Sequence, residues 1–105
     1  MNKLLLLCIV FAAPAFAQDD VANLVIEKRC NACHEKNAAS LGPPWQAIAA
    51  RHAARKELMV DVLASKIVHG GGGNWGNVPM VPNQRVSLDE ARRMAAWILD
   101  LPAGN

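Results

Sequence analysis

The sequence CNACH, residues 30–34, is the stretch around which this chain is organised. It holds two cysteines separated by two residues, and a histidine follows the second cysteine directly. Before it, Val21 and Val25 lie one helical turn apart, and Asp20 suits the N-terminal end of a helix. We therefore expect a helix from about Asp20 to Cys30, with the motif closing it.

This spacing is the attachment motif for c-type haem. Two thiols add across the two vinyl groups on one edge of the porphyrin, and a two-residue spacer at a helix end sets the sulfur atoms that far apart. The imidazole that follows then lies beneath the iron. The sequence thus predicts one haem c, bound covalently through Cys30 and Cys33, with His34 as an axial iron ligand.

Three other sites use similar residues, and we rank all of them below haem. Two cysteines in an exported chain ordinarily form a disulfide. A two-cysteine redox motif has the same spacing, but it normally opens a helix beside a strand. A zinc site needs four ligands, which Cys30, Cys33, His34 and one of His52 or His69 would supply.

Residues 1–17 have the features of a secretory signal peptide. A lysine precedes a short apolar run over residues 4–13, and Ala15 and Ala17 supply the small residues of a cleavage site. The run is too short to span a bilayer and Pro14 interrupts it, so we rank a membrane anchor or a buried helix below cleavage. Because bacteria attach haem c outside the cytoplasm, export agrees with the motif.

Length and charge narrow the class of protein. The chain has 105 residues, 52% hydrophobic and 19% charged, which is typical of one folded domain, here residues 18–105. With 11 basic and 9 acidic residues, it lacks the charge pattern of a nucleic-acid-binding protein. So short a chain often needs a cofactor, a metal or a disulfide to stabilise its core.

The remaining periodic stretches are helical, and none alternates with a period of two for long enough to form a strand. We expect a short helix from Trp45, one over residues 56–68, and one that Ser87 opens with a capping box and Pro102 ends. The predicted buried face of the 56–68 helix consists of Leu58, Met59, Val62, Leu63 and Ile67. That of the last helix consists of Ala91, Met94, Ala95, Ile98 and Leu101. The predicted fold class is all-α.

Met80 is the predicted second axial ligand of the iron. It lies between Pro79 and Pro82, after the glycines of residues 70–73, in a loop with no helical period. The other methionines after the signal peptide lie on helical stripes. A His/Met pair of ligands raises the reduction potential of haem.

His52 and His69 are the rival ligands. His52 lies beside Arg51 and Arg55, which predicts a solvated side chain. His69 lies at a helix C-terminus, where an imidazole interacts well with the helix dipole. We therefore place both below Met80.

Taken together, these features resemble the short-chain, single-haem, soluble class I cytochromes c of bacteria. The stretches that carry the likeness are residues 30–34, 41–44 and 75–83 and the helix that contains Trp97. The resemblance implies a class I cytochrome c fold, in which three larger helices and a short one pack around one covalently attached haem c. Two features depart from the family pattern: the uniform glycines of residues 70–73, and Val81 where a second proline is common. Both would loosen Met80.

The resemblance also implies roles for residues around the haem. Pro43 is expected to accept a hydrogen bond from His34 through its carbonyl, and Trp75 to donate one to a haem propionate. Lys66 is expected to neutralise a propionate, and Asn83 to lie near the sulfur of the methionine ligand. Trp97 is expected to pack the last helix against the first.

The predicted function is one-electron transfer in the periplasm, without enzymatic activity. We expect the partners to be larger redox proteins: a membrane cytochrome complex as donor and a periplasmic reductase or terminal oxidase as acceptor. We expect a monomer, with no nucleic acid bound and no stable membrane insertion after signal cleavage. Pro43, Pro44, Val78 and Val81 are expected near the exposed haem edge. The alternative is a haem protein with an open or labile sixth position that binds a gas or peroxide.

Overall fold

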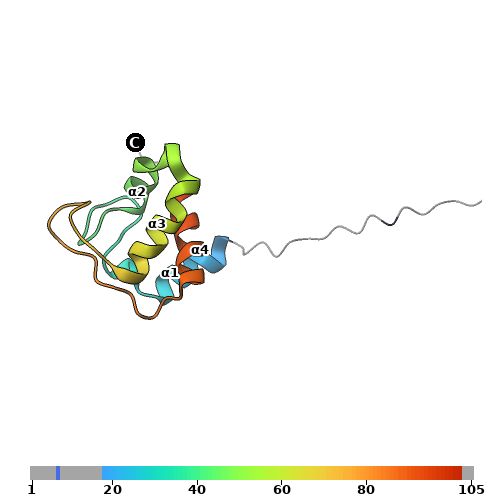
Figure 1. Ribbon diagram of the computed structural model, residues 1–105, viewed down its shortest axis with the longest axis horizontal. Coiled ribbons are helices and arrows are strands. Elements are labelled where there is room, and N and C mark those ends of the chain that lie inside the picture. Colours follow the sequence, from blue (N-terminus) through green and yellow to red (C-terminus); the bar gives the residue numbers. More distant parts are fainter. Residues whose placement is uncertain (1–6, 8–17, 103–105) are drawn as a thin grey trace, which may run out of the picture.

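The computed structural model describes residue 7 and residues 18–102. Apart from Leu7, the predicted signal peptide lies outside the described residues. The helices are α1 (Gln18–Glu27), η1 (Cys30–Ala32), α2 (Trp45–Arg51), η2 (Ala53–Arg55), α3 (Lys56–His69) and α4 (Leu88–Leu99), shown in Figure 1. No strand occurs among residues 18–102, where one isolated bridge joins Gly71 to Met80. The prediction of an all-α fold with three larger helices and a short one is confirmed.

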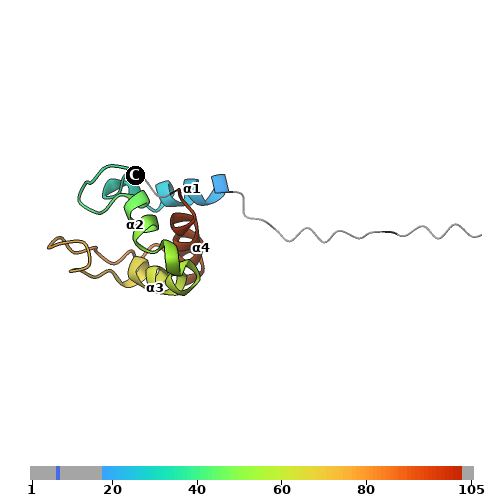
Figure 2. The same ribbon diagram turned by 90° about the horizontal axis from the view of Figure 1, so that it is seen from above.

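The last helix, α4, organises the core. It packs against α1, α2 and α3, and it lies beside α1 and α3 in both ribbon views (Figures 1 and 2). Ala91, Met94 and Ala95 are completely buried, and Ile98 nearly so, as the spacing of the apolar residues predicts. Leu101, the last residue of the predicted stripe, lies beyond the helix and is half-buried. The core therefore depends on α4, which contacts the three other α-helices of the described chain.

The buried face of α3 is narrower than its sequence predicts. Leu58 and Val62 are 75% and 47% exposed, whereas Ile67 is buried and Ala64, which the prediction omitted, is fully buried. Because α3 packs mainly against one neighbour, α4, only the stripe that faces α4 leaves solvent. On the flank beside Val62, Asp61 accepts a hydrogen bond from the guanidinium of Arg92 in α4 at 2.9 Å.

The first helix ends before the CNACH motif instead of running into it. Arg29 adopts a left-handed conformation with φ of 63°, which stops α1, and Cys30 then opens a separate 3₁₀ turn. The expectation of one helix from Asp20 to Cys30 was therefore wrong at its end. The motif lies on its own short turn, which the left-handed residue sets at an angle to α1.

Two long connections, residues 33–44 and 70–87, leave the same side of the helices (Figures 1 and 2). They carry most of the residues for which the sequence predicts contact with haem. Among the residues that the structure describes, no helix is long and apolar enough to span a bilayer.

The start of α4 is stabilised by the predicted capping box. The Ser87 hydroxyl accepts a hydrogen bond from the Glu90 amide at 3.1 Å, and the Glu90 carboxylate accepts one from the Ser87 amide at 3.0 Å. This second bond is the main reason that the pKa of Glu90 is lowered, and Lys28 of the α1–η1 connection lies 3.6 Å from the same carboxylate. The cap thus fixes where α4 begins relative to the motif.

Replacing Ser87 with alanine removes one half of this box. We expect the free energy of unfolding to fall by about 1 kcal/mol, the usual cost of losing a serine N-cap. Denaturant unfolding of the wild type and S87A measures the difference, with S65A on the exposed face of α3 as the control. An equal loss in both variants would contradict a specific capping role.

Candidate functional site

The 3₁₀ turn places the two cysteines and the histidine of the motif together. The amides of Cys33 and His34 both donate to the Cys30 carbonyl, at 3.2 and 3.0 Å. Cys30 and Cys33 are half-buried free thiols, so the alternative of a disulfide between them is not formed in this structure. Burial raises the pKa of the Cys30 thiol, although a backbone hydrogen bond partly opposes this shift. The turn therefore presents two unpaired thiols.

His34 is buried and tightly held. Its Nδ1 donates to the Pro43 carbonyl at 2.7 Å, because a carbonyl oxygen can only accept. Nε2 is then the nitrogen that keeps a lone pair for a metal. Gly42 passes so close that a Cβ there would lie 2.5 Å from Cε1 of the imidazole. The indole of Trp45 stacks on the same imidazole, with ring centroids 4.4 Å apart.

The backbone of Met80 is fixed by two glycines. The Met80 amide donates to the Gly71 carbonyl at 2.7 Å, and the Gly71 amide donates to the Met80 carbonyl at 3.0 Å. Gly70 has φ of 71°, and a Cβ at this position would collide with the Met80 carbonyl. The first two glycines of the run therefore anchor Met80, contrary to the expectation that the run loosens it.

Asn83 connects this loop to the helices. Its side-chain amide donates to the Lys28 carbonyl at 3.0 Å, and its backbone amide donates to the Ile67 carbonyl at 3.2 Å. Its side-chain oxygen accepts from the Arg85 amide. The described hydrogen bonds thus direct Asn83 toward α1 and α3, and its predicted place near the Met80 sulfur stays a prediction.

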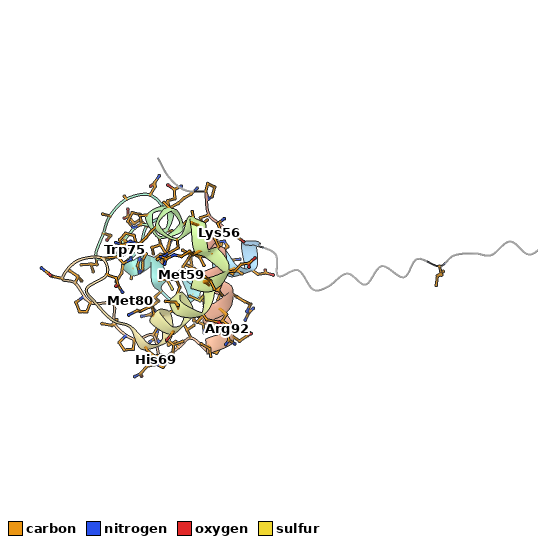
Figure 3. The ribbon with its side chains drawn as sticks, turned by 45° about the horizontal axis from the view of Figure 1, so that its top comes forward. Lys56, Met59, His69, Trp75, Met80 and Arg92 are labelled. Atoms are coloured by element: carbon orange, nitrogen blue, oxygen red, sulfur yellow. The ribbon has the colours of Figure 1, made fainter. Side chains whose placement is uncertain are left out.

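Arg51 binds the tip of the same loop, a contact that the sequence analysis missed. Its guanidinium lies 3.9 Å from the centre of the Trp75 ring and donates to the Asn74 carbonyl at 2.7 Å. Trp75 is 42% exposed. Figure 3 shows it on the same side of the molecule as Met80. Lys66 also reaches this region, since its Nζ would lie 2.9 Å from a Cβ at Gly71. No local sequence signal pairs Arg51 with a loop so far along the chain.

The two rival histidines are placed differently from each other. His52 is buried, so the prediction of a solvated side chain was wrong. With Trp45, Ile48 and Ala49 it continues the buried stripe of α2 at helical spacing. Burial, and then the charges of Arg55 and Arg51, lowers the pKa of His52.

His69 is exposed at the end of α3. Within the described part of the chain, no three His, Cys, Asp or Glu side chains come together as a metal site. The zinc alternative therefore lacks a ligand set here.

The loops around the motif expose large apolar side chains. Leu41, in the first connection, is 65% exposed. Val78 and Val81, in the second connection, are 60% and 73% exposed, and Trp75 lies a few residues before them. Exposed apolar side chains on these two connections suit contact with an apolar group. Haem c fits this donor set: two unpaired thiols, a buried imidazole with Nε2 available, a thioether on a loop whose backbone is anchored, and exposed apolar side chains on the loops.

Replacing Arg51 with glutamine should loosen the 72–79 loop. Arg51 of α2 makes both a side-chain hydrogen bond and a ring contact to this loop. We expect the backbone amides of residues 72–78 to exchange with deuterium about fivefold faster, since the variant loses an exposed cation–π contact and one hydrogen bond. Mass-spectrometric hydrogen exchange measures this.

The control is R55Q, which removes a nearby positive charge that has no contact with the loop. If R51Q leaves the rate of amide exchange in residues 72–78 unchanged, Arg51 does not restrain the loop. The same conclusion follows if R55Q raises that rate as much as R51Q does.

Comparison with known proteins agrees with this geometry. The Cytochrome c family model matches residues 18–102. Cytochrome c-552 of Hydrogenobacter thermophilus is 43% identical over 102 residues, covering 96% of this chain and 99% of that protein. Cytochrome c-551 of Allochromatium vinosum is 37% identical, covering 87% of this chain and 98% of that protein.

A solved structure gives the same result for the fold. The crystal structure of wild-type Nitrosomonas europaea cytochrome c552 superposes with a TM-score of 0.70 at 40% identity, covering 74% of this chain and 95% of that one. The predicted class I cytochrome c fold is thereby confirmed. Since the family model spans the whole helical domain and these relatives match most of both chains, this chain belongs to the cytochrome c family of electron carriers.

Proposed function

We propose that this protein is a periplasmic one-electron carrier with a single haem c, attached through Cys30 and Cys33 and ligated by His34 and Met80. The observation that carries the proposal is the state of His34. Its Nδ1 is occupied by the Pro43 carbonyl, and its Nε2 remains for iron beside two unpaired thiols. Membership of the cytochrome c family supports the covalent haem and the electron-carrier role.

The haem, when bound, supplies the one-electron iron couple, and the protein tunes it. The hydrogen bond from His34 to Pro43 makes the imidazole a stronger donor, which favours the oxidised state. The thioether of Met80 favours the reduced state. The bridge between Gly71 and Met80 holds the ligand's backbone in place, so a shift of the whole residue away from the site would have to break two hydrogen bonds.

The remaining residues act at the edge of the haem. We propose that Trp75 donates to a propionate through its indole, and that Lys66 neutralises a propionate charge. Asn83 is proposed to tune the potential from beside Met80. The ring contact with Arg51 supports the role of Trp75, because it restrains the indole, and the hydrogen bond from Arg51 to the Asn74 carbonyl holds the neighbouring backbone.

We also propose export and transient pairing with larger redox proteins. Residues 1–17 would direct the chain to the periplasm and be removed there. A membrane cytochrome complex would donate the electron and a periplasmic reductase or terminal oxidase would accept it. The exposed apolar residues Leu41, Val78 and Val81 suit a small, weak interface that turns over quickly.

Optical spectra of the exported protein, made in a host with haem-attachment machinery, test this proposal. We expect sharp low-spin bands, a haem that resists acid–acetone extraction, and a weak near-infrared sulfur-to-iron band in the oxidised state. M80A should lose the near-infrared band and keep the covalent haem.

M59L is the matched control, because Met59 is a half-buried methionine on α3 with no predicted role as a ligand. It should keep the near-infrared band. A colourless wild-type protein would contradict the haem proposal. A high-spin wild-type spectrum without the band would remove Met80 as the ligand and favour binding of a gas or peroxide at the sixth position.

A further inference from the structure

We propose that Trp45 is a positioning residue that fixes the plane of the His34 ring and lowers the reduction potential of the haem through an aromatic stack. The inference rests on the proposed function, because it requires His34 to be bound to iron.

The stack joins the motif to the first residue of α2. The two ring planes are 21° apart, with centroids separated by 4.4 Å, and both side chains are buried. The Trp45 amide donates to the Glu35 carbonyl at 2.8 Å, and the next amide, of Gln46, donates to the Lys36 carbonyl at 3.0 Å. The segment that follows His34 is therefore tied directly to the turn that carries Trp45.

The indole is itself held from the core. Trp97 of α4 meets Trp45 edge-on, with centroids 6.4 Å apart and ring planes 75° apart, a favourable geometry for two aromatic rings. Trp45 thus connects the His34 ring to the central helix of the fold. The bond to Pro43 fixes one atom of the imidazole, and the stack fixes the tilt of its plane.

The stack also acts on the iron electrostatically. The face of an indole carries negative charge density and attracts a positive group above it, more strongly than the face of phenylalanine does. An imidazole bound to ferric iron is more positive than one bound to ferrous iron. Trp45 therefore stabilises the oxidised state more than the reduced state, which lowers the potential.

If Trp45 only filled space, its removal would lower the reduction potential instead of raising it. Loss of a buried apolar side chain admits water, and water stabilises the more highly charged ferric state. A smaller filler would thus lower the potential, whereas loss of the indole face raises it. The sign of the change separates the two roles.

The experiment is a redox titration of the haem-loaded wild type, W45L, W45F and L99A. We expect W45L to raise the potential by an amount equal to about a fourfold change in the ratio of reduced to oxidised protein, or about 35 mV at 59 mV per tenfold for one electron. W45F should raise it by less than half as much. Electron paramagnetic resonance of the ferric W45L protein should show a changed orientation of the imidazole.

L99A is the control, since it removes a fully buried apolar side chain of α4 that is not part of the core cluster containing Trp45. It should reduce stability and leave the potential close to that of the wild type. If W45L does not fold, a potential of W45F that is equal to or below the wild-type value overturns the inference.

In folded W45L, an unchanged or lowered potential overturns the inference, as does an equal rise in L99A. Failure of the proposed function is distinguishable, because the wild-type spectrum would then lack covalent low-spin haem before any variant is compared.

Discussion

The hydrogen bond from His34 to the Pro43 carbonyl is the interaction on which the site depends. It joins the end of the CNACH motif to the residue pair that leads into α2, and it decides which imidazole nitrogen remains for a metal. Gly42 permits the approach because it has no side chain, and Trp45 stacks on the ring because α2 begins there. Three residues within the stretch 42–45 therefore hold the ring in direction, position and tilt.

Features with a local physical cause could be predicted from the sequence. The capping box at Ser87 and Glu90 depends on two residues three apart, and the buried stripe of α4 depends on helical spacing. The motif itself is likewise a matter of spacing. For the same reason the all-α class and the order of the helices were correct, whereas the end of α1 was not, because Arg29 adopts a backbone conformation that arginine rarely takes.

Features that depend on distant neighbours could not be predicted. His52 looked solvated because its sequence neighbours are arginines, but the stripe of α2 buries it against the core. Leu58 and Val62 looked buried because they are apolar, but α3 has one main packing partner. The contact of Arg51 with Trp75 joins residues far apart in the chain, and neither residue carries a sign of the other. The parts of the site that depend on neighbouring residues in the sequence could thus be predicted, whereas the contacts between distant segments could not.

The central position of α4 has a consequence for biosynthesis. Val21 and Val25, near the start of the described chain, become buried in a core that also contains Ala91, Met94, Ala95 and Ile98 of α4. A nascent chain from which α4 has not yet left the ribosome therefore cannot form that core, and its apolar residues stay exposed to water. Folding has to wait until α4 has been made, so a product terminated before residue 88 would remain an unfolded substrate for proteases and would not persist as a partly functional fragment.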